Sequence, residues 1–150
     1  MTRFATVAAT LLLATATVSA QGKTTEALLA ELFRPVMPQP RWLDRDATRA
    51  RARLQITSDL AAFDGHFPAM PILPGVTQLD WAIELARGCF ALPERFMRVE
   101  ALKFQRPIRP GHAVELDLQW QPEGGVLAFR YISDDGPHSS GRVYFGAGDA

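Results

Sequence analysis

Residues 49–57 alternate strictly between polar and apolar side chains. One side of an extended chain would carry Ala50, Ala52, Leu54 and Ile56, and the other Arg49, Arg51, Arg53 and Gln55. Successive side chains of a β-strand point to opposite faces of a sheet, so the pattern predicts a half-buried strand with a basic outer face. We expect these arginines to be solvated, although they, or Arg106 and Arg109, could dock an acidic partner.

From Gly75 to about Phe90 the pattern changes to the period of a helix. Apolar residues fill well over a third of the helical wheel, namely Leu79, Ala82, Ile83, Leu85, Ala86, Cys89 and Phe90. A narrower polar arc holds Thr77, Asp80, Glu84 and Arg87. A helix this apolar should be covered on most sides by other structure. A shorter helix is expected over residues 24–33, followed by a proline-rich extended linker.

The chain after Pro93 has the character of β-structure throughout. Strands are expected at residues 96–104, 112–121, 126–133 and 142–146, with turns at 106–111, 123–125 and 134–137. Short turns favour antiparallel neighbours. One strand, one buried helix and three or four further strands predict an α+β domain, in which an antiparallel sheet wraps around one long central helix.

The composition of the 150 residues fits one globular domain with a substantial core. The formal net charge is zero, which argues against a nucleic-acid partner. Cys89 is the single cysteine, which excludes an internal disulfide and a thiolate metal cage, and we expect it to be inert packing. The histidines lack a second ligand at metal-binding spacing, so we expect no metal and no cofactor. His112 and His138 are expected to be solvated.

Residues 1–22 are set apart from the domain expected over residues 23–150. An arginine near the start precedes an apolar, alanine- and threonine-rich run that ends in the small residues Ser19 and Ala20. This form is typical of a secretory signal, and it is too short and too rich in threonine for a good membrane span. An alanine-rich extension, or a start site placed too early, would give the same pattern.

The loop before the long helix is unusually rigid. Prolines at positions 68, 71 and 74 each fix their own φ and restrain the preceding residue. A backbone held in this way can aim chemical groups at a ligand. The candidates are the imidazole of His66, the first free helix amides at Gly75 and Val76, and the carboxylate of Asp80.

The motif Gly65-His66-Phe67-Pro68-x-x-Pro71-x-x-Pro74-Gly75-Val76, with an acid at position 80, resembles the active-site signature of the hotdog-fold 3-hydroxyacyl-(acyl-carrier-protein) dehydratases. A second block, Phe104-x-Arg106-Pro107-x-x-Pro110-Gly111, is similar to that family as well. The resemblance covers roughly residues 42–146 and is nearest to the small dehydratases of aryl-polyene-type pathways. It implies a hotdog fold, a homodimer and an acyl carrier protein that brings the 3-hydroxyacyl-phosphopantetheine substrate in the cytoplasm.

The resemblance also implies roles for single residues. His66 would be the catalytic base, the Gly75 amide would hold the thioester carbonyl, and Asp80, where most members carry Glu, would act on the hydroxyl. His66 and Asp80 would come from different subunits. The implied substrate-binding residues are Gly75, Val76, Phe67 and Pro74.

Elementary chemistry supports these roles. Removing water from a 3-hydroxyacyl thioester needs a base that takes a proton from the carbon next to the carbonyl. Histidine can be this base, because its side chain can be neutral near pH 7. The carbonyl oxygen gains negative charge, which helix N-terminal amides stabilise. The departing hydroxyl needs a proton, which a carboxyl group can supply when its surroundings raise its pKa.

Two other functions stay open. A hotdog thioesterase would use Asp80 to activate water and would not need His66. A non-catalytic acyl-binding protein, exported if the segment before Gln21 is a genuine signal, would have no need for a histidine, a glycine and an acid at these separations.

Overall fold

The computed structural model describes residues 24–25, 36–64 and 70–146. Its contacts divide the chain into two units, residues 1–35 and 36–150, and the sheet and the long helix belong to the second unit. The boundary expected after residue 22 and most of the helix expected over residues 24–33 lie outside the described residues, so both stay predictions. No helix in the described part of the chain is long and apolar enough to span a bilayer.

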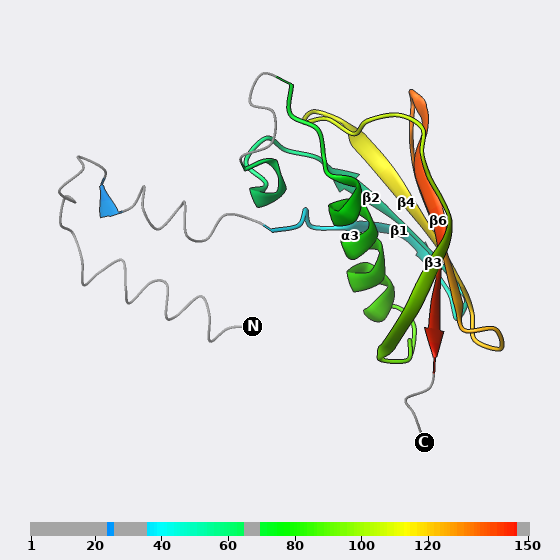
Figure 1. Cartoon of the computed structure of the whole chain (residues 1–150). Coiled ribbons are helices and arrows are strands. Elements are labelled where there is room, and N and C mark those ends of the chain that lie inside the picture. Colours follow the sequence, from blue (N-terminus) through cyan, green and yellow to red (C-terminus); the bar gives the residue numbers. More distant parts are fainter. Residues whose placement is uncertain (1–23, 26–35, 65–69, 147–150) are drawn as a thin grey trace. The chain divides into compact units, whose positions relative to one another are not determined.

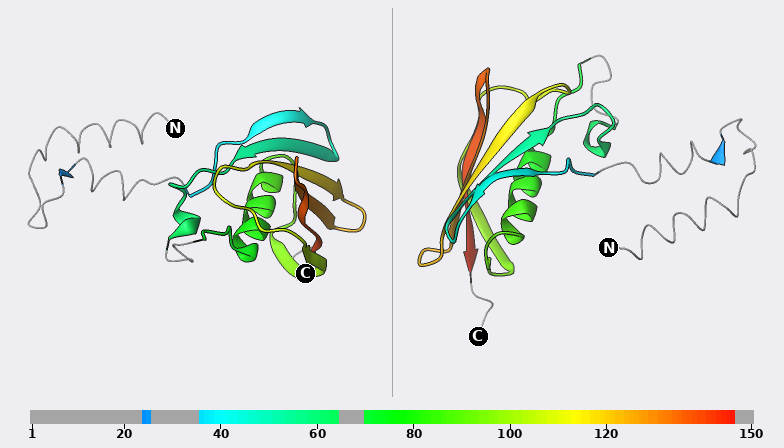
Figure 2. Two further views of the ribbon diagram at one scale, coloured as in Figure 1. Left: turned by 90° about the horizontal axis from the view of Figure 1, so that it is seen from above. Right: turned by 180° about the vertical axis from the view of Figure 1, so that it is seen from behind.

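An antiparallel sheet forms the frame of the second unit (Figure 1). Its strands are β1 (Arg41–Arg45), β2 (Arg49–Gln55), β3 (Arg95–Phe104), β4 (Ala113–Gln121), β5 (Val126–Ser133) and β6 (Gly136–Gly146). They lie in the order β1-β2-β4-β5-β6-β3, and every neighbouring pair is antiparallel. Figure 2 shows the sheet curving around helix α3 (Gly75–Arg87), which confirms the α+β architecture expected from the sequence.

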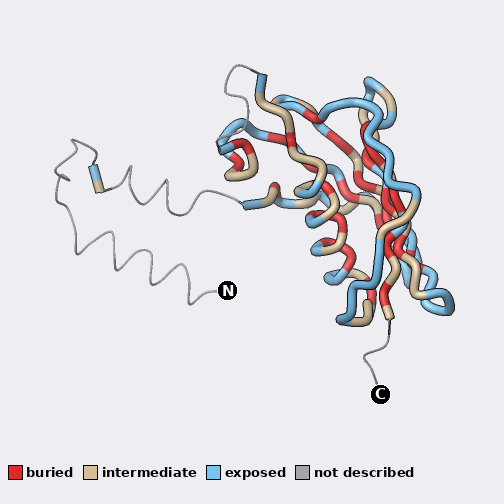
Figure 3. Tube along the Cα trace, in the orientation of Figure 1, coloured by how far each residue is buried: buried red, intermediate tan, exposed pale blue. Residues whose placement is uncertain are grey.

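Helix α3 begins where the proline spacing predicts. Pro74 is its N-cap, with extended backbone angles, and Gly75 is its first residue. The face toward the sheet is buried and consists of Gln78, Trp81, Ala82, Leu85 and Ala86. The tube in Figure 3 is red where this face and the inner face of the sheet approach one another. Arg87 in the last turn suits the negative end of the helix dipole, and the helix ends there instead of continuing to Phe90.

The inward-facing apolar side chains of the strands form the other half of the core. On β2 the predicted inner residues Ala50, Ala52 and Leu54 are fully buried, and on β4 the same is true of Val114, Leu116 and Leu118. The short 3-10 helix η1 (Ala61–Phe63) adds Phe63 to the same cluster. The alternating pattern therefore predicted the inner face of β2 correctly, and β4 follows the same pattern.

Two strands differ from the expectation. The sequence does not indicate β1, because its residues are mostly charged and only Trp42 among them packs against the core. Its pairing with β2 holds it in place. Strand β6 begins at Gly136, not at Arg142 as expected. The turn before it is tight, and Gly136 closes that turn at φ +109°, a conformation that suits glycine.

The two edges of the sheet differ in character. Edge strand β1 is mostly charged, whereas edge strand β3 exposes large apolar side chains, namely Phe96, Met97, Leu102 and Phe104. Figure 3 shows most of β3 in the pale blue of exposed residues. An exposed apolar edge strand is a ready surface for pairing with another chain.

Candidate active site

The start of α3 offers free hydrogen-bond donors. The amides of Thr77 and Gln78 both donate to the carbonyl of Pro74, each over 3.1 Å. Within the described residues, no acceptor binds the amides of Gly75 and Val76. These amides lie at the positive end of the helix dipole, so they are suited to an oxygen that carries negative charge.

A cleft of about 360 Å³ lies beside these amides. One wall comes from the loop and first turn of α3, with Ile72, Leu73, Gly75 and Gln78. The other wall comes from the end of β3 and the segment after it, with Phe104, Gln105, Arg106 and Pro107. The two motifs singled out in the sequence therefore face one another across one cleft.

Tyr131 on β5 contacts the first turn of α3 from the side of the sheet. Its hydroxyl is completely buried and donates to the main-chain carbonyl of Gln78 over 2.6 Å. Burial, and to a smaller extent the negative charge of Asp80, raise the pKa of Tyr131 above its ordinary value, so the phenol stays protonated as a donor.

The predicted site residues are partly brought together. Pro74, Gly75 and Val76 lie at the start of α3, and Gly75 lines the cleft. Asp80 lies further along α3, is exposed to solvent and does not line the cleft within one chain. His66 and Phe67 lie outside the described residues. Their roles, and that of Asp80, therefore remain predictions.

The expectation that His138 is solvated is wrong. Its side chain is fully buried, and burial is the main cause that lowers its pKa below the ordinary value. A register shift where β5 meets β6 leaves His138 without a cross-strand partner, and this bulge directs it inward. His112 is half-buried, with Nε2 3.3 Å from Asp135 Oδ2.

Cys89 is half-buried, and burial raises the pKa of its thiol, which fits inert packing. Sequence reasoning missed Gln78 and Ser139, two buried polar residues that contact each other. Nothing local to either residue signals this contact, because they are far apart in the chain. No cluster of potential metal ligands occurs among the described residues.

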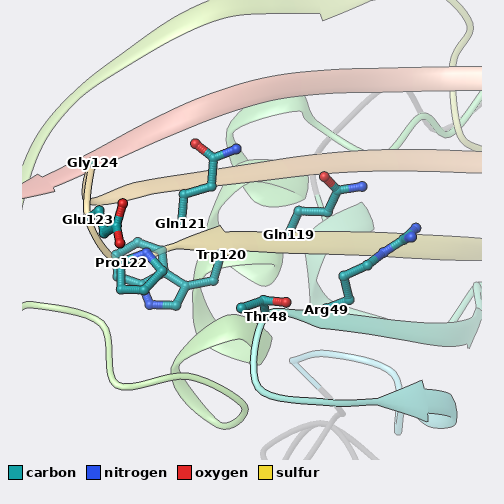
Figure 4. Close-up of a pocket in the computed structure, with 8 residues that line it drawn as sticks. All are labelled: Thr48, Arg49, Gln119, Trp120, Gln121, Pro122, Glu123 and Gly124. Atoms are coloured by element: carbon teal, nitrogen blue, oxygen red, sulfur yellow. The ribbon is translucent and has the colours of Figure 1, made fainter.

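A larger hollow of about 620 Å³ lies at the opposite end of β4 (Figure 4). Arg49, Gln119, Gln121 and Glu123 line it together with Trp120 and the following turn. The figure shows these polar side chains spread along the rim without converging on a common point. None of the sequence motifs contributes to this hollow, so we assign the chemistry to the cleft at α3.

The comparisons with known proteins agree with the motif. The model of the ApeI-like family, described as ApeI dehydratase, matches residues 42–142. The 3-hydroxyacyl-(acyl-carrier-protein) dehydratase FabZ of Thermus thermophilus is 33% identical in an alignment of 104 residues that covers 64% of this chain and 69% of the relative.

Solved structures agree as well. The dehydratase heterocomplex ApeI:P from Xenorhabdus doucetiae is similar with a TM-score of 0.64 and 34% identity, covering 71% of this chain and 96% of that one. A hot-dog-like protein from Thermanaerovibrio acidaminovorans is 20% identical, has a TM-score of 0.50, covers 69% of this chain and 84% of that one, and bears on the fold alone. The chain has the hotdog fold and belongs to the ApeI-like dehydratase family.

Proposed function

We propose that this protein removes water from a 3-hydroxyacyl thioester carried by an acyl carrier protein and yields the trans-2-enoyl thioester. Membership of a dehydratase family and the similarity to FabZ support this substrate class. The observation that carries most weight is the pair of free amides at Gly75 and Val76, which open beside a cleft with largely apolar walls. An acyl thioester needs both an apolar channel and donors for its carbonyl oxygen.

The reaction assigns one task to each predicted residue. The His66 imidazole takes a proton from the carbon next to the thioester carbonyl, while the Gly75 amide stabilises the negative charge on the carbonyl oxygen. The electron pair left by the proton forms the new double bond, the bond from carbon 3 to oxygen breaks, and Asp80 gives its proton to the departing hydroxyl, which leaves as water. No redox partner is needed.

We further propose that the active form is a dimer that pairs through β3. This edge exposes Phe96, Met97, Leu102 and Phe104, and Phe104 also forms one wall of the cleft. A second chain on this edge would cover the apolar side chains and approach the cleft directly. Each site would then combine His66 of one subunit with Asp80 of the other, which explains why Asp80 does not reach the cleft of its own chain.

The direct test is His66→Ala with a 3-hydroxyacyl carrier-protein substrate. Loss of the general base should lower kcat by at least about 100-fold, measured as the rise of enoyl thioester. The matched control is His112→Ala, which removes a half-buried histidine outside the cleft and should leave the rate within about twofold. Activity of His66→Ala near the wild-type level would reject the assignment.

Product analysis separates the alternatives. A thioesterase would release free acid and thiol, would lose activity in Asp80→Asn and would keep it in His66→Ala. A non-catalytic exported acyl-binding protein would show no turnover, and mass spectrometry would place its mature N-terminus near Gln21 outside the cytoplasm.

A further inference from the structure

Two neighbouring residues of β6 turn polar side chains into the core. His138 and Ser139 are both fully buried, although neighbours on a regular strand point to opposite faces. The register shift explains this arrangement. Ser139 pairs with Tyr131 and Pro137 pairs with Ile132, so His138 is the extra residue of a bulge. Bulges re-aim side chains, and here both neighbours reach toward the cleft region.

His138 holds the wall that follows β3. Its carbonyl accepts the amides of Gln105 and Arg106 over 2.8 and 3.2 Å. Its Nδ1 lies 3.3 Å from the carbonyl of Arg106 and 3.2 Å from that of Pro107, so Nδ1 carries the ring proton and donates to them. Nε2 then accepts the hydroxyl of Ser133 over 2.6 Å. Every polar atom of the neutral ring is thus satisfied.

Ser139 holds the opposite wall. Its hydroxyl donates to Oε1 of Gln78 over 2.6 Å, and Nε2 of Gln78 donates to the carbonyl of Leu73 over 3.1 Å. Gln78 is itself buried, so this side chain spans from the sheet to the proline-rich loop just before the free amides. A buried glutamine that lost either partner would leave an unsatisfied polar group.

A further hydrogen bond closes the path. The amide of Leu73 donates to the carbonyl of Ile108 over 2.8 Å, and Ile108 directly follows the Pro107 carbonyl that His138 binds. The closed ring therefore runs from Ser139 through Gln78, Leu73 and Ile108 to His138, which is bonded to Ser139. Both walls of the cleft are parts of this ring.

We propose that His138 and Ser139 are positioning residues, which fix the separation of the two cleft walls and thereby determine which acyl thioesters fit beside the Gly75 amide. The inference rests on the proposed function for its substrate class. The hydrogen-bonded ring ties both cleft walls to the same short stretch of β6. Breaking this ring at Ser139 therefore lets Gln78 and the proline-rich loop move relative to the wall that contains Phe104. Catalytic groups are untouched, so the change concerns selectivity more than the chemical step.

The test compares Ser139→Ala with Ser139→Thr and with Ser140→Ala. Thr keeps a hydroxyl at the same position, and Ser140 is the next residue of β6 and lies outside the ring. For each variant, kcat and KM are measured for 3-hydroxybutanoyl and 3-hydroxydecanoyl carrier-protein thioesters. Ser139→Ala should change the ratio of the two kcat/KM values by about fivefold or more, as expected for one buried hydrogen bond, mainly through KM. Ser139→Thr should restore the ratio, and Ser140→Ala should leave it within about twofold.

A second measurement needs no turnover. Hydrogen exchange at the Leu73 amide reports directly on the ring, and Ser139→Ala should speed it by about fivefold or more, while Ser140→Ala should not. An unchanged exchange rate at Leu73, or an unchanged ratio in an active enzyme, would overturn the proposal. If the wild type shows no turnover but Ser139→Ala still speeds exchange at the Leu73 amide, the proposed function is rejected and the hydrogen-bonded ring is retained.

Discussion

Phe104 covers Gly75 so closely that a Cβ atom at Gly75 would lie 2.5 Å from Cζ of the phenylalanine ring. The helical backbone at Gly75 accepts any residue, so the glycine matters here only for the space that the Phe104 ring occupies. In a single chain the ring is about half exposed, so it can swing away when a methyl group is added. Such a movement would rearrange the wall of the cleft next to the free amide.

We predict that Gly75→Ala folds but loses activity. Displacement of the cleft wall and of the carbonyl-binding amide by a fraction of an ångström to about 1 Å should lower kcat/KM by about 100-fold. Thermal unfolding should show a small loss of stability, because the displaced ring of Phe104 is not part of the core of the chain. The measurement is steady-state dehydration alongside circular dichroism.

Phe104→Ala provides the control for this steric argument. In a chain that already lacks the ring, Gly75→Ala should cost much less activity than in the wild type, so the two changes should be strongly non-additive. Additive effects would show that Gly75 matters for another reason than its contact with Phe104.

The fold was largely accessible from the sequence because burial leaves a periodic mark. The alternation along β2 and β4 and the apolar arc of α3 reflect faces that pack into one core. Strand β1 leaves little such mark, because it lies at the edge and is held by backbone pairing with β2. Hydrophobic periodicity reflects burial, so an edge strand that packs only one side chain against the core shows little periodicity.

The site could also be predicted from the sequence, but for a different reason and to a smaller extent than the fold. Proline spacing and the glycine at position 75 mark the start of α3, because they constrain the backbone locally. The contact of Gln78 with Ser139 joins residues from distant parts of the chain and has no local signature. His138 was expected to be solvated because no strand was expected before Arg142, whereas β6 includes it and a bulge turns it inward.

Ala101 on β3 offers a test of backbone strain. It has φ +53°, which is the left-handed region, and it lies where β3 shifts register against β6. Alanine pays roughly 1 kcal/mol for this conformation, so Ala101→Gly should raise the unfolding free energy by up to about that amount. Ala128→Gly on β5 is the matched control and should lower it by about 0.5–1 kcal/mol. Chemical denaturation of both variants measures the difference, and destabilisation by Ala101→Gly would contradict the assignment of strain.

The proposed dimer would pair through the apolar edge strand β3. Met97→Glu places a charge among the exposed apolar side chains of β3 and should raise the dimer dissociation constant by at least about tenfold. Leu43→Glu on the opposite edge, β1, is the control and should leave association unchanged. Sedimentation at several concentrations measures both. Equal dissociation by the two variants, or none by Met97→Glu, would place the interface elsewhere.

The buried imidazole of His138 predicts how stability depends on pH. Its pKa is lowered in the folded state, chiefly by burial and also by the nearby His112 and Arg106, whereas the unfolded chain has the ordinary histidine pKa of about 6.5. Between the two values the unfolded state binds more protons, so the contribution is complete above about pH 6.5 and is lost as the pH falls through the folded-state pKa.

Unfolding free energies of the wild type should therefore decline between about pH 7.5 and pH 5, and His138→Asn should show a shallower decline. Asparagine retains a donor for the carbonyls of Arg106 and Pro107, so we expect the variant to fold. His112→Asn controls for the neighbouring half-buried ring and for its contact with Asp135. Parallel pH curves for the wild type and His138→Asn would show that His138 gains protons equally in both states, which is incompatible with a neutral ring that binds two carbonyls and a serine hydroxyl.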